Sequence, residues 1–383
     1  MMSKLTRNRR IWPLAAILAL FLLSLASAAP LVTASSPTGL SLPRTTDSQT
    51  CFQNINDAVA QQNALSPETD TQLLQTAESS SQYQAFSQTG NVSVVSTIPA
   101  MEYRTTSACA GITVEAYTFS FISEGKELSI AVDPSTMSVI RTLTVPAVSW
   151  GVALNSSSYP WGGGYGYWNG STYSSPTYPW YYIEGDWSLP TVTSGCSGGC
   201  TYGIWSGLTN TYGGEYMAQT GFGADAYSSG STNYWLWYQF YGYGNPHDCT
   251  FTVSPGNTLL SASYSSAWAS SGGSASSYNE DTYDSSVGQG CATSSAFSWS
   301  SLGTNSYFAI LTGETQQSTI PDFGQVTITG TIYDNVYNGG PSGHCTSTPY
   351  SNGDAESFYY SYGGNIMTES LDNGHCAFND DYW

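Results

Sequence analysis

The chain has 383 residues, of which 8 are Lys or Arg and 27 are Asp or Glu, so its formal net charge is −19 at pH 7. All 8 basic residues precede Thr142, whereas 17 of the 27 acidic residues follow it. A polyanion would find no cation in that C-terminal part, which excludes nucleic-acid binding there. Carboxylates take up protons near a pKa of about 4, so their mutual repulsion disappears in acid. The composition therefore indicates a protein made for an acidic medium outside the cell.

The first 28 residues have the pattern of a signal peptide. A basic start from Lys4 to Arg10 precedes an apolar run from Ile11 to Leu25, and Ala26-Ser27-Ala28 offers small residues for cleavage. The alternative is a membrane anchor, but a span needs about 20 apolar residues and this run is shorter. We therefore expect a secreted product with no membrane segment in its mature form.

Eight cysteines in an oxidising compartment favour disulfides. One sequence does not determine their connectivity. The simplest hypothesis pairs sequence neighbours, which gives Cys51 with Cys109, Cys196 with Cys200, Cys249 with Cys291, and Cys345 with Cys376.

Residues 29–145 read as a small α+β domain. Ser66 can cap a helix whose first turn holds Pro67 and whose apolar face holds Leu73, Leu74 and Ala77. Three strands are predicted after it, at Ile112–Ile122, Glu127–Val132 and Ser138–Thr144. A unit of this size can fold on its own.

Residues 146–334 are rich in Ser, Thr, Gly, Tyr and Trp and show no helical period. Short alternating runs separated by turn residues predict strands at Trp180–Ile183, Tyr234–Tyr241, Thr258–Tyr264, Tyr307–Thr312 and Gln325–Tyr333. The fold class that this pattern predicts is mainly β, a two-sheet antiparallel β-sandwich. Residues 335–383 are rich in Gly and Tyr and are expected to form a C-terminal extension, either a hairpin or a flap.

Several common catalytic sets fit the sequence poorly. A Ser/His/Asp triad would need His247, His344 or His375, and imidazole is protonated and useless as a base in acid. Ser197 lies in a Gly-x-Ser-x-Gly stretch, but cysteines flank it and no helix is predicted after it, so a disulfide-closed turn is favoured. The two His-Cys pairs at 344–345 and 375–376 favour a disulfide over a zinc site, and we expect neither metal nor cofactor.

An ordered series of short blocks carries a resemblance to a known family. The blocks are Ile183-Glu-Gly-Asp-Trp-Ser-Leu-Pro190, Gly203-Ile-Trp-Ser-Gly207, Ala218-Gln-Thr-Gly221, Tyr234-Trp-Leu-Trp-Tyr-Gln-Phe-Tyr241, Val253-Ser-Pro-Gly-Asn257 and Asp322-Phe-Gly-Gln-Val-Thr-Ile328. Their order and spacing resemble the glutamic peptidases, or eqolisins, over about residues 150–333. The resemblance implies a sandwich of the lectin and glucanase type, and it implies that residues 29–145 are a propeptide-like domain. An independent accessory domain is the alternative.

The resemblance also implies a catalytic glutamine and a catalytic carboxylate. Gln219 matches the glutamine, whose amide would donate to the developing oxyanion. The glutamate is not at its expected place, where the match puts Leu311 or, after a shift of one residue, Thr312. Glu314 is the nearest carboxylate and is our candidate base, with Glu184 or Asp186 as relocated alternatives. We expect Trp205, Trp237, Gln239 and Asp225 to contact substrate, and Gln239 stands where the family has a glutamate.

Two functional hypotheses of different classes follow. The first is a secreted, monomeric acid endopeptidase whose partner is a polypeptide substrate. The second is an inactive sandwich of the same fold that binds a polymer such as a carbohydrate through Tyr and Trp side chains. A surface-coat or adhesive protein is a third, weaker option. A carboxylate close to the Gln219 amide would favour the peptidase.

Overall fold

The structure is a computed structural model, and it describes residues 54–55, 57–60, 65–96, 99–105, 111–148, 161–167, 180–192, 195–209, 217–241, 246–265, 278–295, 308–315, 321, 323, 325–334, 356–362, 367–371 and 377–382. The proposed signal peptide and the cysteines at 51, 109, 345 and 376 lie outside these residues. In the part of the chain that is described, no helix is long and apolar enough to cross a membrane.

The first elements form what we call the N-terminal module, residues 65–148. It contains α2 (Pro67–Glu78), α3 (Ser81–Ser87), β1 (Ser93–Val94), β2 (Ala100–Thr105), β3 (Ile112–Ser123), β4 (Lys126–Asp133) and β5 (Ser138–Pro146). The Ser66 hydroxyl caps α2 by accepting a hydrogen bond from the Thr69 amide, and Leu73 and Ala77 are buried. The predicted helix and the three predicted strands are confirmed, whereas α3, β1 and β2 were not predicted.

The strands that follow are β6 (Trp161–Tyr167), β7 (Trp180–Ser188), β8 (Cys200–Thr209), β9 (Met217–Ala226), β10 (Thr232–Tyr241), β11 (His247–Asp248), β12 (Thr258–Ser265), β13 (Tyr278–Asp284), β14 (Gln289–Ser295), β15 (Phe308–Thr315), β16 (Gln325–Asp334), β17 (Glu356–Tyr362), β18 (Met367–Leu371) and β19 (Ala377–Tyr382). All of the predicted strands in this part are present.

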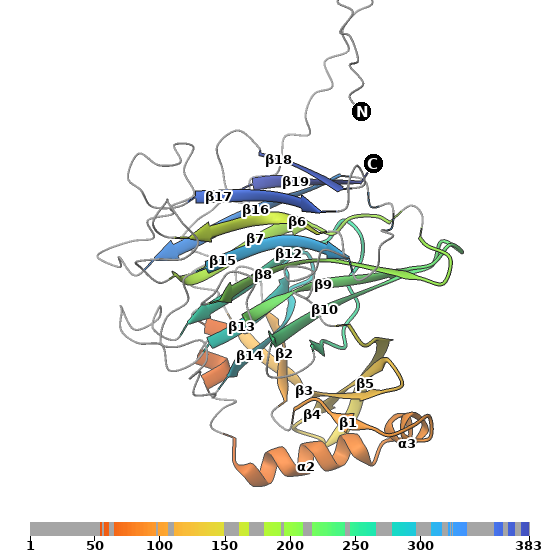
Figure 1. The fold of residues 1–383 in the computed structure, drawn as a ribbon. Coiled ribbons are helices and arrows are strands. Elements are labelled where there is room, and N and C mark those ends of the chain that lie inside the picture. The colour runs from red at the N-terminus through yellow and green to blue at the C-terminus, as the bar shows by residue number, and fades with distance from the viewer. Residues whose placement is uncertain are drawn as a thin grey trace, which may run out of the picture. The chain divides into compact units, whose positions relative to one another are not determined.

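Two antiparallel sheets make the fold (Figure 1). Sheet A runs β18-β19-β16-β7-β12-β13-β14-β2-β3-β4-β5, with β1 paired to β3, and sheet B runs β11-β10-β9-β8-β15-β6-β17. The mainly β, two-sheet prediction is therefore confirmed. The C-terminal extension contributes to both sheets, since β17 pairs with β6 and β19 pairs with β16.

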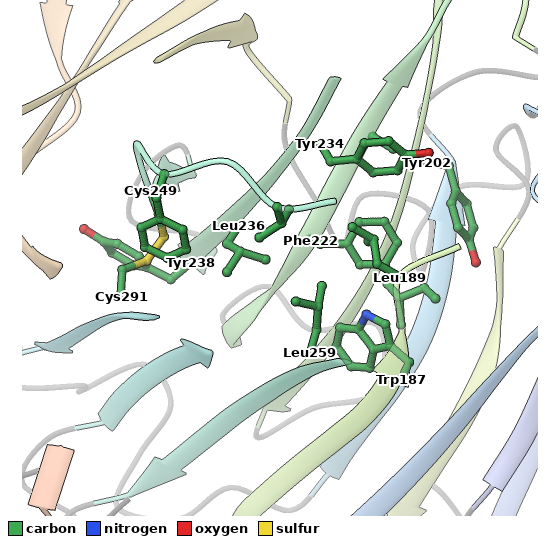
Figure 2. Close-up of a cluster of buried hydrophobic side chains, with 14 of the residues drawn as sticks. Trp187, Leu189, Tyr202, Phe222, Tyr234, Leu236, Tyr238, Cys249, Leu259 and Cys291 are labelled. Atoms are coloured by element: carbon green, nitrogen blue, oxygen red, sulfur yellow. A yellow bond between two sulfur atoms is a disulfide. The ribbon is translucent and has the colours of Figure 1, made fainter. Parts of the chain in front are cut away.

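The core lies between the sheets, where large side chains from facing strands interdigitate (Figure 2). On sheet B, alternate residues of β8, β9 and β10 point inward, so Tyr202, Phe222 and Leu236 belong to this core. Trp187 and Leu259 meet them from sheet A. The alternation places the intervening residues of β8, β9 and β10 on the outer face of sheet B.

Both described disulfides join the predicted partners. Cys196 is bonded to Cys200, which closes the turn around Ser197 as expected. Cys249 is bonded to Cys291 and thereby connects the edge of sheet B to β14 of sheet A. The other two predicted pairs stay predictions.

The N-terminal module continues sheet A, because β2 pairs with β14 from Gln289↔Arg104 to Ala292↔Met101. A second hydrophobic cluster joins the module to the other face of the same sheet. Leu73, Phe86, Tyr103 and Phe119 of the module pack in one cluster with sandwich side chains, which are Leu260, Ala262, Tyr264, Tyr283 and Ala292.

Candidate functional site

The two glycine-containing blocks of β8 and β9 are complementary. In the antiparallel register Gly207 faces Gln219, and Trp205 faces Gly221. A Cβ atom on Gly207 would lie 3.0 Å from the Gln219 Cβ, and one on Gly221 would lie 2.1 Å from the Ile204 carbonyl oxygen. Each large side chain therefore occupies the space that the opposing glycine leaves empty. This explains why Trp-x-Gly and Gln-x-Gly occur as a pair.

The amide of Gln219 has a fixed partner on β10. Gln239 lies directly opposite it in the register, and the Gln219 amide nitrogen donates to the Gln239 side-chain oxygen at 2.9 Å. Trp237 lies in the next position of this face, opposite Gly221. Gln219, Gln239, Trp205 and Trp237 are each at most 1% exposed. The structure thus brings four predicted site residues together on the outer face of sheet B.

Hydroxyl groups on the inner face hold these strands against sheet A. Ser206 donates to the Ser261 carbonyl at 2.9 Å, and Ser261 in turn donates to the Thr220 carbonyl. Thr220 donates to the Trp237 carbonyl at 2.8 Å. The residues next to Trp205 and Gln219 are therefore anchored, which restricts the movement of the amide.

The candidate carboxylate Glu314 lies on β15, on the far side of β8. The row that contains Gln219 and Gly207 continues to Ile310 on β15. Thr312 is in the next row, opposite Trp205, and Glu314 is one row further, opposite Gly203. Leu311 belongs to the opposite alternation of the strand. Two strands and two rows separate Glu314 from Gln219, which corresponds to about 16 Å between Cα atoms for regular spacing.

The remaining predicted carboxylates lie apart from the amide pair. Asp225 shares the alternation of Gln219 but is six residues further along β9, opposite Asn233. Burial raises the pKa of Asp225. Glu184 and Asp186 belong to β7 of sheet A. The structure does not group these three with Gln219.

A carboxyl pair that was not predicted lies on sheet A. Glu184 and Asp281 occupy one row of the sheet, separated by Ala262. Burial raises the pKa of Asp281 to about 8, with a further contribution from the charge of Glu184, while the hydrogen bond from Tyr103 acts in the opposite direction. The Tyr103 hydroxyl donates to Asp281 at 2.7 Å. The Asn-Glu-Asp run at 279–281 is the sequence signal that could have identified it.

Other buried carboxyl groups are also kept from ionising. Burial raises the pKa of Glu280 well above its ordinary value, although the Ser263 hydroxyl donates to it at 2.6 Å. Burial also raises the pKa of Asp248, with the neighbouring Glu127 as the next cause. Among the described residues no group of three His, Cys, Asp or Glu side chains could hold a metal ion.

Comparison with known proteins places the chain beside peptidases. The sequence profile of the Peptidase A4 family matches residues 166–354. Scytalido-glutamic peptidase with a peptide-based transition state analog is 17% identical, with 59% of this chain and 98% of that chain covered and a TM-score of 0.40. SCP-B, described as a member of the eqolisin family of peptidases, is 16% identical with the same coverages and a TM-score of 0.38.

Aspergilloglutamic peptidase from Aspergillus niger is 18% identical, with 48% of this chain and 99% of that chain covered and a TM-score of 0.30. No curated protein sequence matches the chain.

Proposed function

The chain belongs to the Peptidase A4 family over residues 166–354, and from this premise we propose that it is a secreted glutamic-type endopeptidase that works in acid. The observation that carries the proposal is the paired Trp205-Ser-Gly207 and Gln219-Thr-Gly221 blocks, which hold one amide on the outer face of sheet B. An amide donor does not titrate in acid and can stabilise an oxyanion there.

In the proposed mechanism an ionised carboxylate removes a proton from water as the water attacks the scissile carbonyl, and then delivers it to the leaving amine. The Gln219 amide donates to the carbonyl oxygen as negative charge develops. Glu314, on the same face of sheet B, is the candidate carboxylate, but two strands and two rows separate it from Gln219 in this structure, so the proposal requires β15 to move towards Gln219 before both groups can act on one carbonyl. Trp205 and Trp237 are the proposed walls of the substrate site. The Gln219 amide nitrogen carries two hydrogens and donates one of them to Gln239 in this structure, so donation to the substrate oxygen does not require the bond to Gln239 to break.

The buried state of the amide pair adds a requirement. Gln219 is 0% exposed, so a polypeptide can reach its amide only after the groups that bury it move. We propose that an extended, unfolded segment is the substrate, since it can lie along the strands. Residues 29–145 would act as a propeptide-like domain in this proposal, and the enzyme would be a monomer that needs no cofactor.

The carbohydrate-binding alternative receives less support. Sugar rings stack on exposed aromatic faces, but the four tryptophans whose side chains are described, at 187, 205, 235 and 237, are at most 2% exposed.

The test is digestion of a denatured, reduced protein at about pH 4, close to the ordinary pKa of a carboxylate. We expect the secreted protein to cleave it and Gln219→Ala to lose at least about 100-fold in rate, the effect of deleting one oxyanion donor. Gln84→Ala, on the exposed surface of α3, is the matched control. Activity unchanged in Gln219→Ala would contradict the role of this amide, and unchanged activity in Glu314→Gln would remove Glu314 from the mechanism.

A further inference from the structure

Two glutamates of the N-terminal module cover the open edge of sheet B. The last strand of that sheet is β11, and the segment from Asp248 to Thr250 continues it. The Cys249 amide points into the sheet and donates to the Leu236 carbonyl at 2.8 Å. The amides on either side point the other way, where Asp248 donates to Glu127 at 3.1 Å and Thr250 donates to Glu102 at 2.5 Å. The two carboxyl groups take the place of a neighbouring strand.

Glu102 is part of a network that includes a cation. The Arg141 guanidinium donates to Glu102 at 2.7 Å and to Glu115 at 3.1 Å. Thr250 also donates its hydroxyl to Glu102, at 2.9 Å. Glu102 lies opposite Cys291 in the β2–β14 pairing, and the disulfide from Cys291 to Cys249 brings Thr250 within reach. Figure 2 shows this disulfide beside Tyr238.

Glu127 differs, because its partner is another carboxyl group. Its described donors are the Asp248 amide and the hydroxyl groups of Ser120 and Ser129, the last at 3.5 Å. Burial raises the pKa of Glu127, and burial followed by the proximity of Glu127 raises that of Asp248. The other titratable groups that face the pair are Tyr238, on which the charges of Glu127, Asp248 and Glu102 act, and His247, which stacks on Tyr238 at 4.9 Å between ring centroids.

The rest of the contact is apolar and closely fitted. The side chain of Tyr103 on β2 lies against Gly290, and its hydroxyl donates a hydrogen bond to Asp281. A Cβ atom added to Gly290 would lie 2.3 Å from the Tyr103 hydroxyl oxygen. Tyr103 also stacks on Tyr283 with ring centroids 6.4 Å apart. Removal of the module would expose Leu260, Tyr283 and the carboxyl group of Asp281. An exposed surface of this kind promotes association in a soluble protein.

We propose that the N-terminal module is a lasting non-covalent partner of the sandwich in acid, retained even after the chain is cut between β5 and β6, and that Glu127 and Asp248 form a proton-dependent clamp that holds it. The clamp is closed while the two carboxyl groups share a proton and weakens when both are ionised. The inference goes beyond the proposed function and does not depend on peptidase activity. It gives the module a structural role that a discarded propeptide would not have.

The experiment cuts the folded chain at a protease recognition sequence inserted after Val148, which ends the described part of the module. The products are separated by size exclusion at about pH 5 and at about pH 9, on either side of the raised carboxyl titration. We expect the two fragments to elute together at the lower pH and to separate at the higher one. Reducing and non-reducing gels identify any covalent link, and tryptophan fluorescence reports whether the sandwich stays folded.

Glu127→Gln tests the clamp itself. A glutamine oxygen can still accept from the Asp248 amide, and its nitrogen can donate to an ionised Asp248, so this variant should stay together at both pH values. Glu124→Gln removes the same charge from the exposed β3–β4 turn and should behave like the unmodified sequence. Separation of the fragments at about pH 5 would overturn the proposal, and so would a Glu127→Gln variant that separates like its parent.

Hydrogen exchange on the uncut chain provides a second measurement if the insertion prevents folding. After correction for intrinsic rates, the Asp248 and Thr250 amides should be protected at about pH 5. At about pH 9 the protection factor of the Asp248 amide should fall by at least about tenfold, and the Glu127→Gln substitution should prevent that fall. Equal protection of Asp248 at the two pH values in the parent would contradict the clamp.

Discussion

With the exception of the buried Glu127, the carboxyl groups of the N-terminal module and those of the sandwich are stabilised in different ways. In the module, Glu102 and Glu115 are ion-paired with Arg141, and Arg104 also pairs with Glu115. In the sandwich, Glu280 and Asp281 are fully buried, and the sequence after Thr142 offers them no cation. Burial therefore keeps these groups protonated. The comparison teaches that one chain combines a region stabilised mainly by ion pairs with a region stabilised by protonation, and acid favours the second region together with the buried Glu127 of the first.

The largest effect expected in the sandwich comes from its packing rather than its charges. Gly221→Ala would place a Cβ 2.1 Å from a backbone carbonyl oxygen and 2.7 Å from the Trp205 Cβ. We expect this variant to lose about 3 kcal/mol of stability, measured by urea denaturation. Gly207→Ala meets its nearest atoms at 3.0 Å and should lose about 1 kcal/mol. Equal losses would show that Trp205 is not packed against Gly221 as described.

The next effect is the pH dependence that separates the two regions. The pKa of Asp281 is about 8 in the folded protein, whereas an unfolded Asp has about 4. The stabilisation is therefore complete below about pH 4 and is lost as pH rises towards 8. The urea midpoint should rise on acidification from about pH 8 to about pH 5. Asp281→Asn should flatten this dependence, and a midpoint that falls steadily over the same range would contradict the account.

One buried group, His247, has the opposite effect on the pH dependence of stability. Burial lowers the pKa of His247 to about 3, so its contribution to stability is lost as pH falls from about 6.5 towards 3. His247→Phe should therefore make the rise in stability on acidification steeper below about pH 6. An unchanged slope in that range would mean that His247 is already accessible to solvent.

The smallest effect concerns the hydrogen bond between the two regions. Tyr103→Phe removes the donor to Asp281 and should cost about 1 kcal/mol. Because this bond lowers the pKa of Asp281, its loss should also extend the pH dependence to higher pH. Tyr283→Phe is the matched control. The Tyr283 hydroxyl hydrogen-bonds to Thr105 at 2.9 Å, so its removal should leave the pH dependence of stability almost unchanged. The same shift in both variants would contradict a specific link between Tyr103 and Asp281.

The sequence predicted much of this fold because alternation and turn residues mark strands locally. Ser66, Pro67, Leu73 and Ala77 specify α2, and the turn at Glu124-Gly125 separates β3 from β4, with positive φ at both residues. The pairing of β2 with β14 was not predictable, because it joins residues almost 190 positions apart that carry no local signal for each other. The same reason kept Asp248 and Glu127 from being recognised as neighbours.

The residues around the Gln219 amide were predictable from the sequence, whereas the position of the candidate catalytic carboxylate was not. Gln219, Gln239, Trp205 and Trp237 do share one face, since period-two alternation fixes the face of each residue. The position of a carboxylate depends on the register between β15 and β8, which no sequence pattern in this chain specifies. Glu314 shares that face but lies two rows from Gln219.

The proposal of an enzyme that works in acid depends on the claim that the sandwich keeps its buried carboxyl groups protonated. The most direct measurement is a titration of Asp and Glu side-chain carboxyl ¹³C shifts, with Asp281→Asn and Glu280→Gln used to assign the two signals. The account predicts that both groups are still protonated at about pH 6, when exposed carboxylates have ionised. Two signals that complete their titration by about pH 5 would contradict it.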